Sequence, residues 1–188
     1  RRQIPYTIYS GVQFFQRGEV KDALCYLRTL ACRDDLALRR IINVPKRNLG
    51  RRRMAFLEQY AQDKACPLYD ALCDNLEDPL FKGTGAQELV ALVERFSPGC
   101  EQRPVSELLS AILDESGYEA MLRTEGSQER LDNLAELKQS VYAYETSCGE
   151  EAGLSDYLAH VALFTNGDAD GGDDRVRMMT VHAAKGLE

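Results

Sequence analysis

The sequence predicts a mainly α fold, with a large helical body between short flanking strands. Apolar residues recur at helical spacing through most of the 188 residues. The two ends, at 4–10 and 176–181, are instead rich in strand-forming residues. This arrangement is typical of a helical insertion whose two ends return to the sheet of a host domain.

The individual elements follow from local patterns. Residues 4–10 alternate β-formers and stop at Gly11, which predicts a strand and a turn. An amphipathic helix is expected from Gly18 to about Arg33, and Asp34 can cap the next helix, which ends before Pro45. Further apolar stripes predict helices at about 51–63, 66–75, 85–96, 105–116, 128–146 and 154–164. The breaks between them are marked by Pro79, Gly83, Gly85, Pro98, Gly99, Gly117 and Gly126.

Composition and the chain ends restrict the class of protein. Hydrophobic residues make up 44% and charged residues 28%, as in soluble globular proteins. No apolar run is long enough to span a bilayer, and no signal peptide is recognisable, so we expect a cytoplasmic protein without a membrane partner. The chain has no initiating Met and stops at Glu188, so we expect a piece of a longer protein.

The six cysteines give little support to a metal or redox site. None forms a C-x-x-C pair. Cys25 and Cys32 are seven residues apart, as are Cys66 and Cys73, so each pair is predicted on one helical face. We therefore interpret the cysteines as small buried hydrophobes in a reduced compartment, and expect no bound metal.

Charge is distributed unevenly along the chain. The formal net charge is −7, yet residues 39–53 carry seven basic residues and no acidic one. Residues 145–174 carry eight acidic residues and no Lys or Arg. The basic run is what a polyanion site requires. The run at 165–175, which lacks apolar periodicity, is predicted to be an acidic flexible linker; its Gly and Glu positions do not fit a calcium loop.

The C-terminal stretch 178–188, Met-Met-Thr-Val-His-Ala-Ala-Lys-Gly-Leu-Glu, carries the most specific motif. It predicts a strand, a turn of small residues, a Lys-Gly pair and a carboxylate. Small residues let the backbone approach a phosphate or sugar, and a helix start favours an anion. Any strand–turn–helix corner could share these properties, but the string resembles motif V of the UvrD/Rep/PcrA helicases.

Three other stretches resemble the same family, in the same order and at the expected spacing. Residues 4–28 are similar to the segment that leads into its accessory subdomain. Residues 40–50, Arg-Ile-Ile-Asn-x-Pro-x-Arg-Asn-Leu-Gly, resemble its I-N-x-P-x-R-G-I-G loop. Residues 130–137 match a later helix. The resemblance therefore covers the chain from end to end.

The resemblance implies a helical accessory subdomain, called 2B, inserted in a RecA-like α/β domain, called 2A. Residues 1–21 would end the first segment of 2A, 22–164 would form 2B, 165–175 the linker, and 176–188 the return to 2A with motif V. The parent protein would be an ATP-dependent 3′→5′ DNA helicase that uses ATP and Mg²⁺. Its expected partners are single-stranded and duplex DNA, bound without sequence preference, and repair or replication proteins.

Site residues carry over where the family motifs match. The expected ATP contacts are Gly186 and Glu188. The expected single-strand contacts are Thr180, His182 and Lys185. The expected duplex contacts are Lys46, Arg47, Asn48, Leu49, Gly50 and Arg51. Asn48 replaces the family's first loop glycine, and it tolerates a left-handed backbone less freely. Cations at the start of a helix oppose its dipole, which favours a DNA role for Arg51 and its neighbours.

The chain also lacks motifs that catalysis needs. There is no G-x-x-x-x-G-K-[ST] loop, no acidic Walker B strand end and no arginine finger, so we expect no catalytic residue and no bound cofactor in this fragment. One alternative is the same module of a helicase–nuclease. Another is a non-catalytic helical adaptor that binds a protein through its acidic 145–174 stretch.

Overall fold

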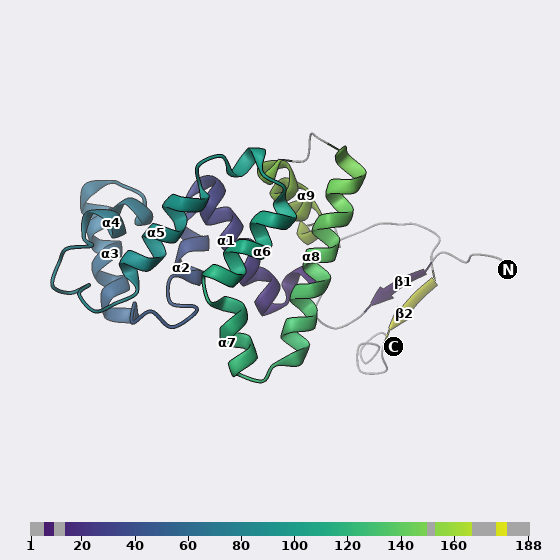
Figure 1. Ribbon diagram of the computed structural model, residues 1–188, viewed down its shortest axis with the longest axis horizontal. Coiled ribbons are helices and arrows are strands. Elements are labelled where there is room, and N and C mark those ends of the chain that lie inside the picture. Colours follow the sequence, from purple (N-terminus) through teal and green to yellow (C-terminus); the bar gives the residue numbers. More distant parts are fainter. Residues whose placement is uncertain (1–5, 10–13, 150–152, 167–175, 180–188) are drawn as a thin grey trace, which may run out of the picture.

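The computed structural model describes residues 6–9, 14–149, 153–166 and 176–179, which form nine α-helices, two 3₁₀ turns and two strands (Figure 1). The strands are β1 (Tyr6–Tyr9) and β2 (Val176–Met179), and the 3₁₀ turns are η1 (Phe14–Gln16) and η2 (Cys100–Gln102). The helices are α1 (Gly18–Cys32), α2 (Asp35–Ile41), α3 (Arg51–Lys64), α4 (Leu68–Asp74), α5 (Ala86–Phe96), α6 (Val105–Glu115), α7 (Tyr118–Thr124), α8 (Gln128–Cys148) and α9 (Leu154–Asn166).

Helix α1 is the centre of the helical body. It packs against α2, α5, α6, α8 and α9, and most of its apolar residues are buried. Helices α3 and α4 pack on each other and form one end of the body (Figure 1). Helices α6, α7 and α8 contact one another, and α7 and α8 lie away from α3 and α4 (Figure 1). No described helix is both long enough and apolar enough to cross a bilayer.

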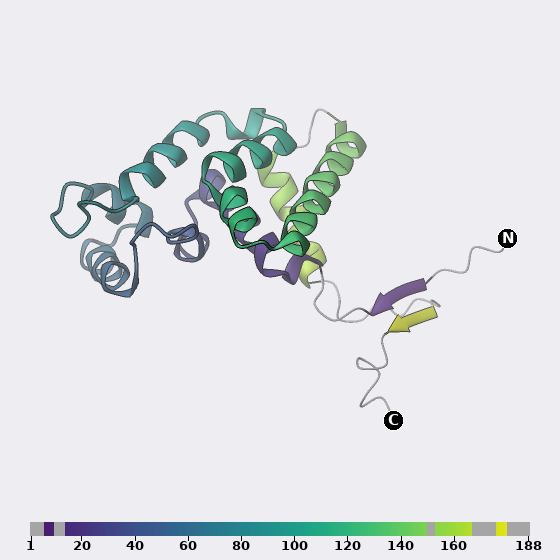
Figure 2. The same ribbon diagram turned by 60° about the horizontal axis from the view of Figure 1, so that its bottom comes forward.

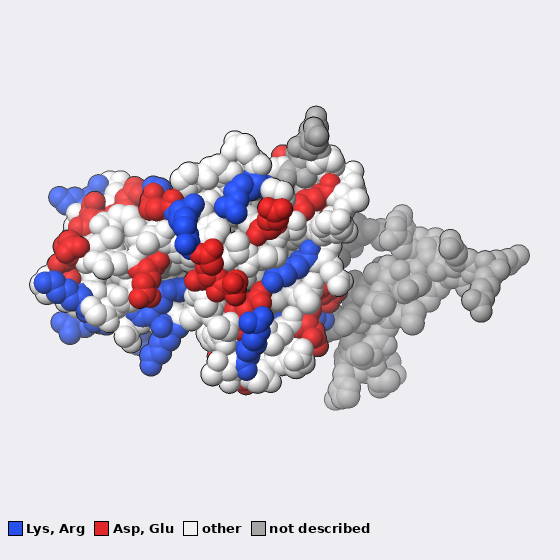
Figure 3. Space-filling view, in the orientation of Figure 1, with Lys and Arg blue, Asp and Glu red and all other residues white. Residues whose placement is uncertain are grey.

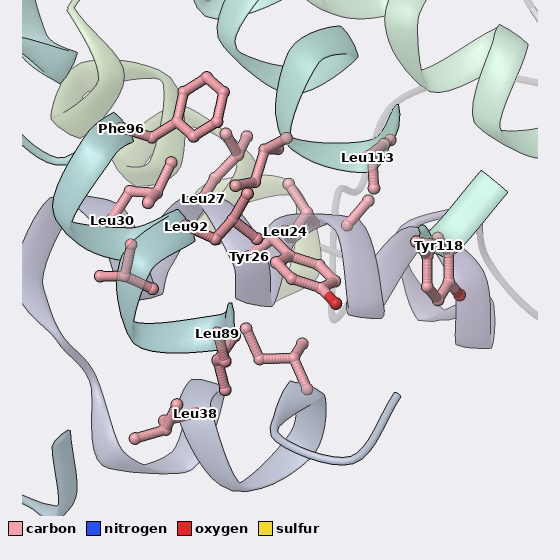
Figure 4. Close-up of a cluster of buried hydrophobic side chains, with 14 of the residues drawn as sticks. Leu24, Tyr26, Leu27, Leu30, Leu38, Leu89, Leu92, Phe96, Leu113 and Tyr118 are labelled. Carbon is pink, nitrogen blue, oxygen red and sulfur yellow. The ribbon is translucent and has the colours of Figure 1, made fainter. Parts of the chain in front are cut away.

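One continuous core runs through these helices. Figure 4 shows side chains of α1, among them Leu27, in one cluster with Leu92 and Phe96 of α5, and Tyr118 of α7 beside the ring of Tyr26. The Tyr26 and Tyr118 ring centroids are 6.1 Å apart in an edge-on arrangement. This extensive burial of apolar side chains is the main source of stability for the body.

The two ends of the helical body lie together. Turn η1, where the body begins, contacts α9, where it ends. Strands β1 and β2 pair in parallel, with Tyr6 opposite Val176 and Tyr9 opposite Met179. In Figures 1 and 2 this strand pair lies beyond the body, at the end opposite to α3 and α4. The two predicted terminal strands are thus present and pair with each other, whereas their place in the sheet of a host domain stays a prediction.

Most predicted helices are present within a few residues of their expected bounds, and the Asp34 side chain caps α2 by accepting from the Ala37 amide at 2.7 Å. Helix α7 is the exception, because the prediction treated Gly117 and Gly126 only as breaks. Both glycines have positive φ and delimit a short helix, which buries Tyr118 and Leu122.

The prediction for the cysteines needs correction at several positions. Cys66 precedes α4 rather than sharing a helical face with Cys73. Cys32 and Cys148 are exposed, Cys25, Cys66 and Cys73 are half-buried, and Cys100 alone among the six is buried.

Candidate nucleic-acid interface

The predicted duplex contacts, residues 46–51, lie at the first residue of α3 and in the loop 42–50 that joins α2 to α3. The side-chain oxygen of Asn43 organises it, accepting hydrogen bonds from the amides of Arg47 at 2.9 Å and Leu49 at 3.0 Å. Asn48 has φ of 58°, in the left-handed region that asparagine tolerates better than most residues. Leu49 is 1% exposed and anchors the loop in the core. The loop is therefore a rigid turn, with Asn48 and Gly50 exposed on its outer side.

Arg47 points into the protein. The residue is only 8% exposed. Its guanidinium donates hydrogen bonds to Ile41 O at 3.0 Å and to the Tyr26 hydroxyl at 2.9 Å. Longer bonds reach Ser116 O at 3.3 Å and Pro45 O at 3.4 Å. The Arg47 guanidinium thus ties the loop to α1 and to the end of α6. Its contact with a DNA phosphate stays a prediction.

Tyr26 completes this internal network. Its hydroxyl accepts from Arg47 and donates to Val44 O at 2.7 Å. Burial raises the pKa of Tyr26, and the positive charge of Arg47 opposes part of that rise. The hydroxyl therefore remains protonated and keeps its hydrogen bond to Val44 O of the loop. Neither Tyr26 nor Asn43 was among the predicted site residues.

Three further cations of the basic run are also bound within the protein. Arg39 pairs with Glu58 at 2.9 Å, and Arg40 pairs with Asp22 at 2.6 Å. Arg53 donates to Leu80 O at 2.6 Å and to Asn48 O at 2.7 Å. Of the seven cations in the run, only Lys46, Arg51 and Arg52 are exposed and make no side-chain hydrogen bond or ion pair within the described part of the chain.

Lys46 lies in the loop before α3, and Arg51 and Arg52 are the first two residues of this helix. Gly50 is the N-cap residue and supplies no side-chain cap, and the first turn contains no acidic residue. The amides of Gly50, Arg51 and Arg52 find no hydrogen-bond acceptor among the described residues. Free amides at a helix start and nearby cations both favour an anion. Figure 3 shows blue side chains gathered at the lower left, over α3 and the adjoining loops.

The other predicted contacts cannot be placed in the fold. Thr180, His182, Lys185, Gly186 and Glu188 lie outside the described residues, directly after β2. His160 lies on α9, with its ring centroid 4.7 Å from that of Tyr144.

Comparison with known proteins matches the whole chain to one family. The family model for the UvrD-like helicase C-terminal domain matches residues 1–188. DNA helicase II of Escherichia coli (strain K12) is 34% identical over 195 residues, covering 98% of this chain and 27% of that protein. ATP-dependent DNA helicase PcrA of Staphylococcus epidermidis (strain RP62A) is 36% identical over 196 residues, covering 100% of this chain and 27% of that protein.

PcrA of Staphylococcus aureus (strain NCTC 8325 / PS 47) is 34% identical over 195 residues, covering 100% of this chain and 27% of that protein. The chain spans just over a quarter, 27%, of the length of each of these relatives. The match over all 188 residues agrees with the helical body, the loop and the paired terminal strands described above. The chain therefore belongs to the UvrD-like helicase C-terminal domain family.

Proposed function

We propose that this chain is the part of an ATP-dependent 3′→5′ DNA helicase that contacts duplex DNA and regulates its unwinding. Residues 22–164 would be the 2B subdomain, 1–21 and 176–188 the adjoining parts of 2A, and 165–175 the linker between them. The whole protein would bind ATP and Mg²⁺ and act in the cytoplasm on DNA, with repair or replication proteins as partners. Membership of the UvrD-like helicase C-terminal domain family and the similarity to DNA helicase II and PcrA support this assignment.

The observation that carries the DNA contact is the exposed surface formed by the loop 42–50 and the start of α3. It presents Lys46, Arg51 and Arg52, together with unpaired backbone amides. Cations and amides contact phosphate oxygens whatever the base sequence, and each neutralised phosphate releases condensed counterions. The expected binding is therefore indifferent to sequence and strongly weakened by salt.

Motif V supplies the second half of the proposal. Gly186 and Glu188 would contact ATP, and Thr180, His182 and Lys185 would contact single-stranded DNA or the phosphate side of the nucleotide. These roles rest on the match of residues 178–188 to the family motif. The parallel pairing of β1 with β2 supports them, because a RecA-like sheet consists largely of parallel strands.

Paired charge variants test the duplex site. Arg51 and Arg52 are changed together to Gln, and the matched control changes Arg28 and Arg103 to Gln, so both variants lose two positive charges. Arg28 is on α1 and Arg103 follows η2, which contacts α1. Binding of the full chain to a short duplex is measured by fluorescence anisotropy over a range of salt concentrations.

The site variant is expected to flatten the slope of log K against log salt by about 1.8, or about 0.9 for each lost phosphate contact. The control should retain nearly the whole slope. Equal losses in the two variants would mean that only net charge matters, and the proposed site would be wrong. Salt-insensitive capture of a protein partner, without duplex binding, would favour the adaptor.

A further inference from the structure

The loop between α4 and α5 lies directly against the proposed duplex-binding surface. The carbonyl of Leu80 accepts a hydrogen bond from Arg53 in the first turn of α3, at 2.6 Å. One residue later, the ring of Phe81 packs on Phe56 of α3, with centroids 5.8 Å apart. The loop is fixed again where it ends, because the amide of Gly85 donates to Arg47 O at 2.9 Å.

Arg53 is the link between the two loops. Its Nε donates to Leu80 O, and its Nη1 donates to Asn48 O at 2.7 Å. One planar guanidinium thus holds a carbonyl from each loop, and the fixed geometry of its donors sets their relative position. Arg53 itself is half-buried, so it acts through the loops that it positions.

The α4–α5 loop adds one further cation, Lys82, next to the proposed duplex-binding surface. It lies between the anchors at Leu80 and Gly85, is exposed, and forms no ion pair or hydrogen bond within the described residues. Consecutive Cα atoms are 3.8 Å apart, so its Cα lies within about 8 Å of that of Leu80. The nearest acids along the loop are engaged elsewhere: Asp78 accepts from the Leu80 amide at 2.7 Å, and Glu77 accepts from Gln87 at 3.3 Å.

We infer that the α4–α5 loop forms a second edge of the duplex-binding surface, in which Lys82 contacts a backbone phosphate and Arg53 positions the loop. The inference rests on the proposed function, because it assigns a further contact to the same surface. Lys82 lies on a different segment from Arg51 and Arg52, with anchors of its own at Leu80 and Gly85, so it would contact a different phosphate. The occupant is therefore duplex DNA, recognised through the negative charge of its backbone.

The first test changes one charge. Lys82→Gln in the full chain should lower the salt slope for duplex binding by about 0.9 and weaken binding at low salt. Lys82→Arg should keep both values, because it keeps the charge. Arg103→Gln is the control with the same charge change. If Lys82→Gln behaves like Arg103→Gln, Lys82 makes no phosphate contact and the inference is overturned.

The second test measures the positioning role of Arg53. Arg53→Lys keeps the charge but removes the fork that reaches both carbonyls. We expect Lys82→Gln to reduce the salt slope less in the Arg53→Lys background than in the original chain. Thermal unfolding confirms that each variant is folded. Equal effects of Lys82→Gln in the two backgrounds would overturn the role of Arg53, and the single Lys82 variant decides the phosphate contact even if Arg53→Lys fails to fold.

The Arg51/Arg52 double variant separates failure of this inference from failure of the proposed function. If the double variant loses salt dependence and Lys82→Gln does not, the α4–α5 loop is not part of the interface while the α3 site stands. If the double variant matches its own control, the duplex site at α3 is wrong, and the inference about Lys82 is overturned with it.

Discussion

Arg47→Met distinguishes an internal role of Arg47 from a direct DNA contact. Methionine retains an unbranched stem of similar length, but it cannot donate to the loop carbonyls. The matched variant is Arg51→Met, which makes the same chemical change four residues along, at an exposed side chain. Both variants lose one positive charge, so they differ mainly in burial and in hydrogen bonding.

The expected cost follows from the bonds that Arg47 makes. The bonds to Ile41 O at 3.0 Å and to the Tyr26 hydroxyl at 2.9 Å have ordinary lengths, whereas those to Ser116 O and Pro45 O at 3.3 and 3.4 Å contribute little. Two bonds from a charged donor at about 1.5 kcal/mol each give a loss of about 3 kcal/mol. The methionine variant no longer has the desolvation cost of a buried guanidinium, which offsets part of this loss. We therefore expect the free energy of unfolding to fall by about 2–3 kcal/mol.

Urea unfolding followed by circular dichroism measures this loss. Arg47→Met should lower the free energy of unfolding by the stated amount, and the melting temperature should fall by about 2–4 °C for each kcal/mol. Arg51→Met should leave stability within about 0.5 kcal/mol of the original, as is usual for exposed sites, while it weakens duplex binding.

The opposite pattern would refute this interpretation of Arg47. If Arg47→Met were as stable as the original chain and bound duplex DNA as weakly as Arg51→Met, its guanidinium would be a phosphate contact. The inward hydrogen bonds would then contribute nothing measurable to the fold.

Three further outcomes are expected. The isolated chain should show no ATP hydrolysis with DNA and Mg²⁺, because its sequence has no phosphate-binding loop; turnover that co-purifies with the chain and survives removal of contaminating helicases would contradict this. Gly85→Ala should destabilise the fold by about 1 kcal/mol or more in thermal unfolding, because its Cβ would lie 3.0 Å from Cβ and Cγ of Arg47. Gly18→Ala, with open space around it at the first residue of α1, should not destabilise the fold. Burial raises the pKa of Tyr157 to about 12, so its unfolded form loses the proton first, and the free energy of unfolding should fall between about pH 10 and pH 12, with a smaller fall in Tyr157→Phe.

The helices were predictable because their signal is local. Residues such as Val20, Leu24 and Leu27 repeat at helical spacing, and burial of one face requires that repeat. Helix α7 was not predicted because it has only seven residues and lies between two glycines. Its spacing of Tyr118 and Leu122, four residues apart and both buried, was the available signal.

The candidate site was predictable only in part. The run of basic residues pointed to the turn between α2 and α3, but sequence alone does not distinguish a cation bound inside the protein from an exposed one. The partner Ser116 lies 69 positions from Arg47, and Leu80 lies 27 positions from Arg53. Such contacts depend on tertiary packing, and so does the position of Lys82 beside α3.

The contact between η1 and α9 has a consequence for protein engineering. A module whose first and last elements are neighbours can be excised and its host rejoined by a short turn, since the gap to be closed is small. The same proximity permits transplantation: the body from Phe14 to Asn166 could replace the corresponding segment of a relative without stretching either connection. Exchange of this one segment would give a chimeric protein that carries the loops at Lys46 and Lys82 in the context of the relative.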